Sequence, residues 1–140
     1  MVESKPKVLI TGITGFLGSH VCLTFLKDGS YQVKGTVRDK NRADKLEPLK
    51  EAFGDLYNNL ELVEADLMNS DSIIAATEGC DYIVHTACPF PLVEPKNEEE
   101  MLRPAVDGTL AVLEGAKKHG AKRVVLTSAS SAITFKHPVD

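Results

Sequence analysis

Apolar and polar residues along this chain form blocks that predict strands and helices in regular alternation. Short apolar runs bounded by glycine or turn residues predict buried strands, and apolar residues three or four apart predict amphipathic helices. The predicted strands are residues 7–11, 31–37, 60–64, 81–86 and 123–128. The predicted helices are residues 15–27, 41–53, 70–77 and 98–119.

Two residues help to define the predicted helices. Ser70 is expected to be the N-cap of the third helix, because its hydroxyl can accept a hydrogen bond from the first turn. Pro104 is expected to kink or restart the fourth helix, because proline lacks a backbone N–H. The apolar residues of that helix fit packing on a sheet, and they fit pairing with a partner helix equally well.

Strands that alternate with helices predict an α/β fold with a parallel sheet covered on both faces. Right-handed crossovers then give a doubly wound, Rossmann-type sheet of five strands, with a ligand site at the carboxyl ends of the strands. The fifth strand would be left as an unpaired edge. A chain of 140 residues suits one such domain.

Composition narrows the function further. The formal net charge of −4 argues against a nucleic-acid partner, and no apolar run approaches the roughly 20 residues of a membrane span. The first residues do not resemble a signal peptide. Three cysteines without a CxxC pair suggest reduced thiols, so we expect a cytoplasmic protein. The four histidines show no metal-ligand spacing, and no metal is expected.

The strongest local motif is the glycine-rich turn TGITGFLG at residues 11–18. Gly12 would allow a sharp turn after the first strand, and Gly15 would let backbone N–H groups approach a pyrophosphate. Gly18 would allow the helix to pack closely on the sheet. The spacing is GxxGxxG rather than GxGxxG, but its position between a strand and a helix predicts a dinucleotide site.

The residues at the end of the second predicted strand indicate which dinucleotide the site binds. NAD-binding folds place an acid there to bind the ribose 2′-hydroxyl, whereas this chain has Val37 and then Arg38. Arg38 could make a forked contact with a 2′-phosphate, and Lys45 on the next helix could reach the same group. Asp39 could instead turn inward and bind the ribose. The pattern favours NADP(H), with NAD(H) as the alternative.

Five motifs occur in order: TGITGFLGSH, TVRDK, ADL, HTACP and VLTSAS. Together they resemble the extended short-chain dehydrogenase/reductases of the NAD-dependent epimerase/dehydratase type. The resemblance covers the whole chain and is greatest to the group of dihydroflavonol reductase, cinnamoyl-CoA reductase and yeast ketoaldehyde reductase.

The resemblance implies a role in cofactor binding for several residues. Asp66 would bind the adenine amino group, although it could also be only a helix cap or turn acid. The residues at 86–88 would flank the ribose and the nicotinamide. The implied cofactor-binding set is Gly12, Thr14, Gly15, Phe16, Leu17, Gly18, Arg38, Lys45, Asp66, Leu67, Thr86, Ala87 and Cys88.

The chain departs from the family pattern at the catalytic residues. The family uses a Tyr-x-x-x-Lys pair, which occurs nowhere in this sequence. The position of the family's catalytic serine is Ala129, and either Ser128 or Ser130 could take the role if a bulge turned it inward. We therefore expect residues 1–140 to be the N-terminal, NADP-binding part of a longer protein, without its substrate-binding portion.

These observations predict an NADPH-dependent reductase of a ketone or aldehyde, in which this chain supplies the cofactor site and is inactive alone. Two alternatives remain: an NAD-dependent epimerase or dehydratase, and a non-catalytic dinucleotide-binding subunit of a larger assembly. The expected partner is a small carbonyl substrate, and neither the substrate nor the oligomeric state follows from the sequence.

Overall fold

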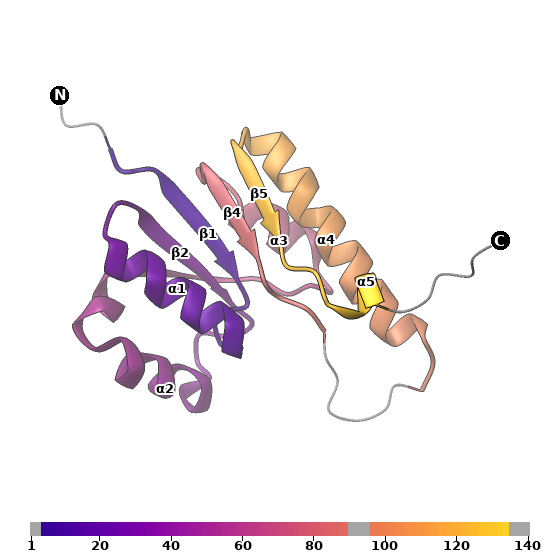
Figure 1. Ribbon diagram of the computed structural model, residues 1–140, viewed down its shortest axis with the longest axis horizontal. Coiled ribbons are helices and arrows are strands. Elements are labelled where there is room, and N and C mark those ends of the chain that lie inside the picture. Colours follow the sequence, from indigo (N-terminus) through magenta and orange to yellow (C-terminus); the bar gives the residue numbers. More distant parts are fainter. Residues whose placement is uncertain (1–3, 90–95, 135–140) are drawn as a thin grey trace.

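A computed structural model describes residues 4–89 and 96–134 of the chain and contains one five-stranded parallel sheet (Figure 1). The strand order is β3-β2-β1-β4-β5, which is the order expected for a doubly wound fold. The elements are β1 (Lys7–Thr11), α1 (Phe16–Asp28), β2 (Gln32–Val37), α2 (Ala43–Phe53), a 3-10 helix (Gly54–Asn59), β3 (Leu60–Glu64), α3 (Ser70–Ala76), β4 (Tyr82–His85), α4 (Glu99–His119), β5 (Arg123–Leu126) and α5 (Ser131–Thr134).

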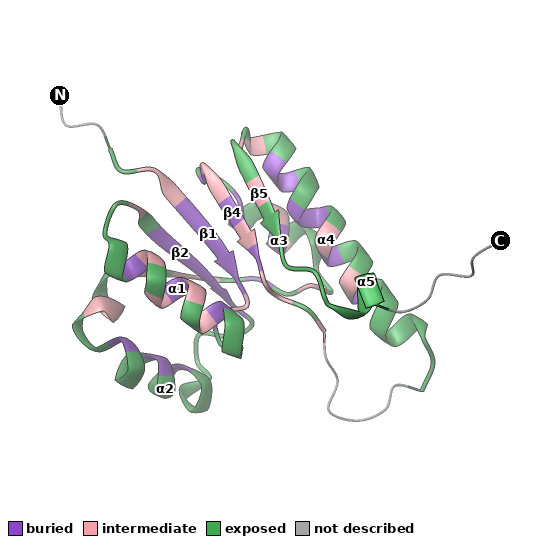
Figure 2. Ribbon diagram, in the orientation of Figure 1, coloured by how far each residue is buried: buried purple, intermediate pink, exposed green. Residues whose placement is uncertain are grey.

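The sheet separates two hydrophobic cores, and β1 contributes to both because successive side chains of a strand point to opposite faces. Val8 and Ile10 pack with side chains of α1 and α2, whereas Leu9 packs with side chains of α3 and α4. Figure 2 shows the central strands buried between these layers. The parallel α/β architecture expected from the sequence is therefore confirmed.

Several predicted boundaries were wrong. β5 ends at Leu126 rather than at Ser128, because its pairing with β4 stops where β4 stops, at His85 opposite Leu126. The N-cap of α3 is Asn69, whose side chain accepts a hydrogen bond from Ser72 N at 3.1 Å, and not Ser70. α4 continues unbroken through Pro104, so this proline does not restart the helix.

Much of the apolar surface of α4 does not face the sheet. Its buried residues are mostly small, among them Gly108, Ala111 and Val112. Leu102 and Leu110 are more than half exposed, so packing on the sheet does not explain them. β5 pairs only with β4 among the described strands, which leaves the expected open edge. No helix in the described residues combines the length and the apolar character of a membrane span.

Candidate functional site

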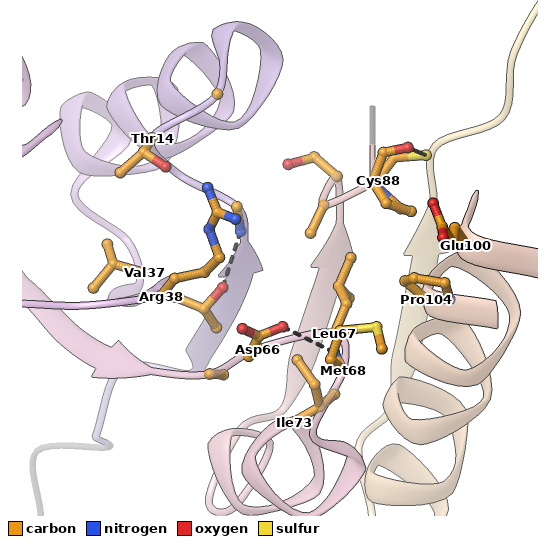
Figure 3. A pocket seen from close by; sticks show the side chains of 17 residues that line it. Thr14, Val37, Arg38, Asp66, Leu67, Met68, Ile73, Cys88, Glu100 and Pro104 are labelled. Atoms are coloured by element: carbon orange, nitrogen blue, oxygen red, sulfur yellow. Dashed lines mark hydrogen bonds between the residues drawn. The ribbon is translucent and has the colours of Figure 1, made fainter. Parts of the chain in front are cut away.

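A cavity of about 520 Å³ opens at the carboxyl ends of the strands, where a parallel α/β fold binds its ligand. Figure 3 shows Arg38 and Asp66 on one side of this cavity and Cys88, Glu100 and Pro104 across from them. The volume is within the usual range of small-molecule sites. The lining residues are Gly12, Thr14, Gly15, Thr36, Val37, Arg38, Ala65, Asp66, Leu67, Met68, Ile73, Thr86, Ala87, Cys88, Pro89, Glu100 and Pro104.

The glycine turn forms the floor of the cavity between β1 and α1. Gly12 has a φ of 72°, in the left-handed region, and its N–H donates to the Thr36 hydroxyl at 2.9 Å. Gly18 lies in the first turn of α1, where an added Cβ would collide with the Gly12 carbonyl and lie 2.8 Å from Thr86 Oγ1. The turn is therefore held at both ends, and only glycine allows this close packing.

The start of α1 can accept an anion. Gly15 is its N-cap, and no side chain among the described residues caps this helix end. The first N–H groups of a helix lack intrahelical partners and carry partial positive charge. Since Thr14 and Gly15 both line the cavity, the donors that begin with Phe16 lie beside it. Without a Cβ at Gly15, a pyrophosphate could approach these donors closely, so the residues fit such a group.

The end of β2 presents Arg38 to the cavity and turns the neighbouring acid away. The Asp39 carboxylate accepts a hydrogen bond from Asn41 N at 2.7 Å, so it folds back on its own loop. Glu64, at the end of β3, accepts from Lys40 N at 2.9 Å and fixes the loop from the other side. Within the described residues Arg38 forms no ion pair, whereas Arg42 pairs with Asp44 at 2.7 Å.

Lys45 lies outside the main cavity. It lines a second hollow of about 360 Å³ between α1 and α2, together with the exposed ring of Phe16. The two hollows share Thr14 and Gly15. Arg38 and Lys45 therefore line different but adjoining hollows, and a shared contact of the two with one phosphate remains a prediction. Leu17 is partly exposed and lines neither hollow, so its role in cofactor binding stays a prediction.

Asp66 follows β3 and serves its own turn while it lines the cavity. One carboxylate oxygen accepts a hydrogen bond from Met68 N at 2.9 Å (Figure 3). Asp66 N donates to the Ser72 hydroxyl at 3.0 Å. Leu67 lies beside it and packs against Gly108 of α4. Asp66 is therefore a turn acid that also lines the cavity, and its contact with the adenine amino group stays a prediction.

The wall opposite Arg38 begins at Thr86 and Ala87, which a buried network attaches to β1. The Thr11 hydroxyl accepts from the N–H groups of Thr86 and Ala87, each at 3.1 Å, and lies 2.8 Å from His85 Nδ1. Burial lowers the pKa of the His85 imidazole, which favours its neutral form. The sequence did not predict this network, because it depends on the register that pairs Thr11 with His85.

Ser128 and Ser130 do not line the main cavity. Both follow the end of β5, so the alternation of a strand does not fix the directions of their side chains. The Ser130 carbonyl accepts from Thr134 N at 2.9 Å at the start of α5. The sequence also missed two α4 residues of the cavity, Glu100 and Pro104, because nothing local indicates that α4 begins beside Cys88.

Two curated reductases are similar to this chain in sequence. Tetraketide alpha-pyrone reductase 1 of Arabidopsis thaliana is 43% identical over 141 residues, which cover 100% of this chain and 43% of that protein. Vestitone reductase of Medicago sativa is 39% identical over 96% of this chain and 41% of its own length. The chain therefore spans about two fifths of the length of these curated relatives.

The similarity extends to solved structures and to a family description. Yeast methylglyoxal/isovaleraldehyde reductase Gre2, solved in complex with NADPH, matches 90% of this chain and 38% of its own chain, with a TM-score of 0.75 and 30% identity. The vestitone reductase structure from alfalfa matches 91% of this chain and 37% of its own, with a TM-score of 0.70 and 36% identity. Residues 8–138 match the NAD dependent epimerase/dehydratase family, and the chain belongs to that family.

Proposed function

We propose that this chain binds NADP(H) in the cavity at the carboxyl ends of its strands. The observation that carries the proposal is the end of β2, where Arg38 lines the cavity and the Asp39 carboxylate is held by Asn41 N. An inward acid would repel a 2′-phosphate, whereas an unpaired guanidinium attracts it and can bind two of its oxygens. The NADPH-bound yeast reductase among the similar structures supports this choice.

Each part of the cofactor would then meet one part of the cavity. The glycine turn and the N-terminus of α1 would hold the pyrophosphate, and Arg38 would bind the 2′-phosphate. Asp66, with its second carboxylate oxygen, would accept from the adenine amino group. Thr86, Ala87 and Cys88 would flank the ribose and nicotinamide. When bound, the nicotinamide supplies hydride chemistry, and this chain supplies position and charge.

We further propose that the full-length protein is an NADPH-dependent reductase of a ketone or aldehyde. The curated relatives tetraketide alpha-pyrone reductase 1 and vestitone reductase are both named as reductases of small molecules. No Tyr-x-x-x-Lys pair occurs in the 140 residues, so the proton donor would come from outside them. Residues 1–140 are then the cofactor-binding part, and they are inactive alone.

The test is turnover by the full-length protein. The absorbance of NADPH would be followed with a panel of aldehydes and ketones, and its substrate-dependent loss is the expected result. NADPH binding without turnover on any carbonyl would favour the non-catalytic subunit. Tight binding of NAD together with epimerisation or dehydration of a substrate would favour the other members of the family. Either result would contradict the proposed reduction.

A further inference from the structure

His85 is nearly fully buried and does not line the cavity, but it touches a residue that organises the cavity wall. It is the last residue of β4 and lies in register with Thr11, the last residue of β1. Thr11 is fully buried. The two side chains approach at 2.8 Å between Thr11 Oγ1 and His85 Nδ1.

The hydrogen bonds of the Thr11 hydroxyl determine the direction of its proton. A threonine hydroxyl has one proton and two lone pairs. The N–H groups of Thr86 and Ala87 both donate to this oxygen at 3.1 Å, which uses both lone pairs. The proton must therefore point to His85 Nδ1, which accepts it as an unprotonated nitrogen. This requires a neutral His85 with its own proton on Nε2.

The backbone at Thr86 and Ala87 transmits this arrangement to the cavity. The Thr86 hydroxyl donates to the Thr11 carbonyl at 2.6 Å, so the segment is attached to β1 at three points. A Cβ on Gly12 would lie 3.0 Å from Ala87 Cα, which shows how closely the segment packs on the glycine turn. Turning the Thr11 hydroxyl proton toward either N–H group would place two protons against each other and weaken that hydrogen bond to the wall.

We propose that His85 is a positioning residue for the cofactor: as an acceptor at Nδ1 it fixes the Thr11 hydroxyl, which holds the Thr86–Ala87 wall against the glycine turn. This inference rests on the proposed binding of NADP(H), and it adds a residue that does not touch the ligand. Its effect should therefore pass entirely through Thr11.

The test compares two variants of nearly equal size in the full-length protein. Asparagine places an oxygen acceptor where His85 has Nδ1, whereas leucine places a methyl group there. We expect H85L to weaken NADPH binding about tenfold, which corresponds to about 1.4 kcal/mol. H85N should stay within about threefold of wild type. Urea unfolding would confirm that each variant is folded under the binding conditions.

A double-mutant cycle with T11V tests whether His85 acts through Thr11. Once the hydroxyl is gone, adding H85L should change NADPH affinity by less than about twofold, because interacting residues are not additive. Equal binding by H85L and H85N, or full additivity with T11V, would overturn the inference.

A nitrogen NMR spectrum of the histidine side chains in the wild-type protein reports whether Nδ1 of His85 carries a proton. This measurement needs no variant, so it also applies if H85L does not fold. An unprotonated Nδ1 on His85 supports the inference, and a protonated Nδ1 overturns it. A wild-type protein that does not bind NADPH would overturn the proposed function. Wild-type binding together with equal H85L and H85N affinities would overturn only the role of His85.

Discussion

Replacing Arg38 with alanine should weaken NADP(H) binding much more than NAD(H) binding. Arg38 lines the cavity at the end of β2 and has no ion-pair partner among the described residues, so its guanidinium is available to a 2′-phosphate. A hydrogen bond to a charged group contributes about 1.5–3 kcal/mol, or about 10- to 150-fold in affinity. Arg38 is exposed to solvent, and screening places the expected loss near the lower end, about 10- to 30-fold.

The assay is titration of the full-length protein with NADPH and NADH, followed by cofactor fluorescence or calorimetry. R42A is the matched control, because Arg42 is a nearby exposed arginine that pairs with Asp44 and does not line the cavity. R42A should leave the ratio of the two affinities within about twofold of wild type. Equal losses of NADPH and NADH affinity in R38A, or the same selective loss in R42A, would refute the reasoning.

Three further results are expected. G18A should destabilise the fold by about 1–3 kcal/mol in urea unfolding, because the new Cβ meets the Gly12 carbonyl. S19A, at the half-buried neighbouring position of α1, should change stability little, and equal effects of the two variants would contradict the packing described. D66A should weaken NADPH and NADH binding by a similar factor, roughly tenfold, because both cofactors contain the adenine that Asp66 is proposed to bind. D71A, which removes an exposed acid of α3, should not weaken binding. A loss confined to one cofactor would refute the assignment. Finally, the hydrogen bond from Lys7 at 2.9 Å lowers the pKa of the Glu61 carboxyl below the ordinary value of 4.5. The stabilisation of the folded state by this pair is therefore present at neutral pH and is lost as pH falls through the lowered pKa. Acid unfolding should therefore be less steep below about pH 4.5 in E61Q; an unchanged pH dependence would show that this pair contributes nothing.

The strands that lie between strong turn signals could be predicted to the residue. β1 and β3 matched their predicted bounds, because an apolar run meets glycine on one side or turn residues on the other. β5 did not, because RVVLTS continues to favour a strand after its partner has ended at His85. Local preference cannot show where a neighbouring strand stops. The prediction of Ser70 as N-cap of α3 was wrong because the preceding Asn69 is also a residue type that caps a helix.

The site residues also fall into two groups: those that local sequence predicts and those that depend on contacts between distant segments. The glycine turn and Arg38 could be found from the sequence, because a strand, a turn and the next strand tip are local features. Lys45 was expected to reach the same phosphate as Arg38; it lines the adjoining hollow, and the shared contact stays a prediction. Glu100 and the Thr11–His85 pair depend on contacts between distant segments, which residue types and spacing do not encode.

The central claim is that the cavity beside the glycine turn binds NADP(H) in preference to NAD(H). The most direct measurement is a calorimetric titration of the full-length protein with NADPH and, separately, with NADH under identical conditions. The predicted result is that NADPH binds at least about tenfold more tightly than NADH, a difference of about 1.4 kcal/mol. Equal affinities, or tighter binding of NADH, would contradict the account.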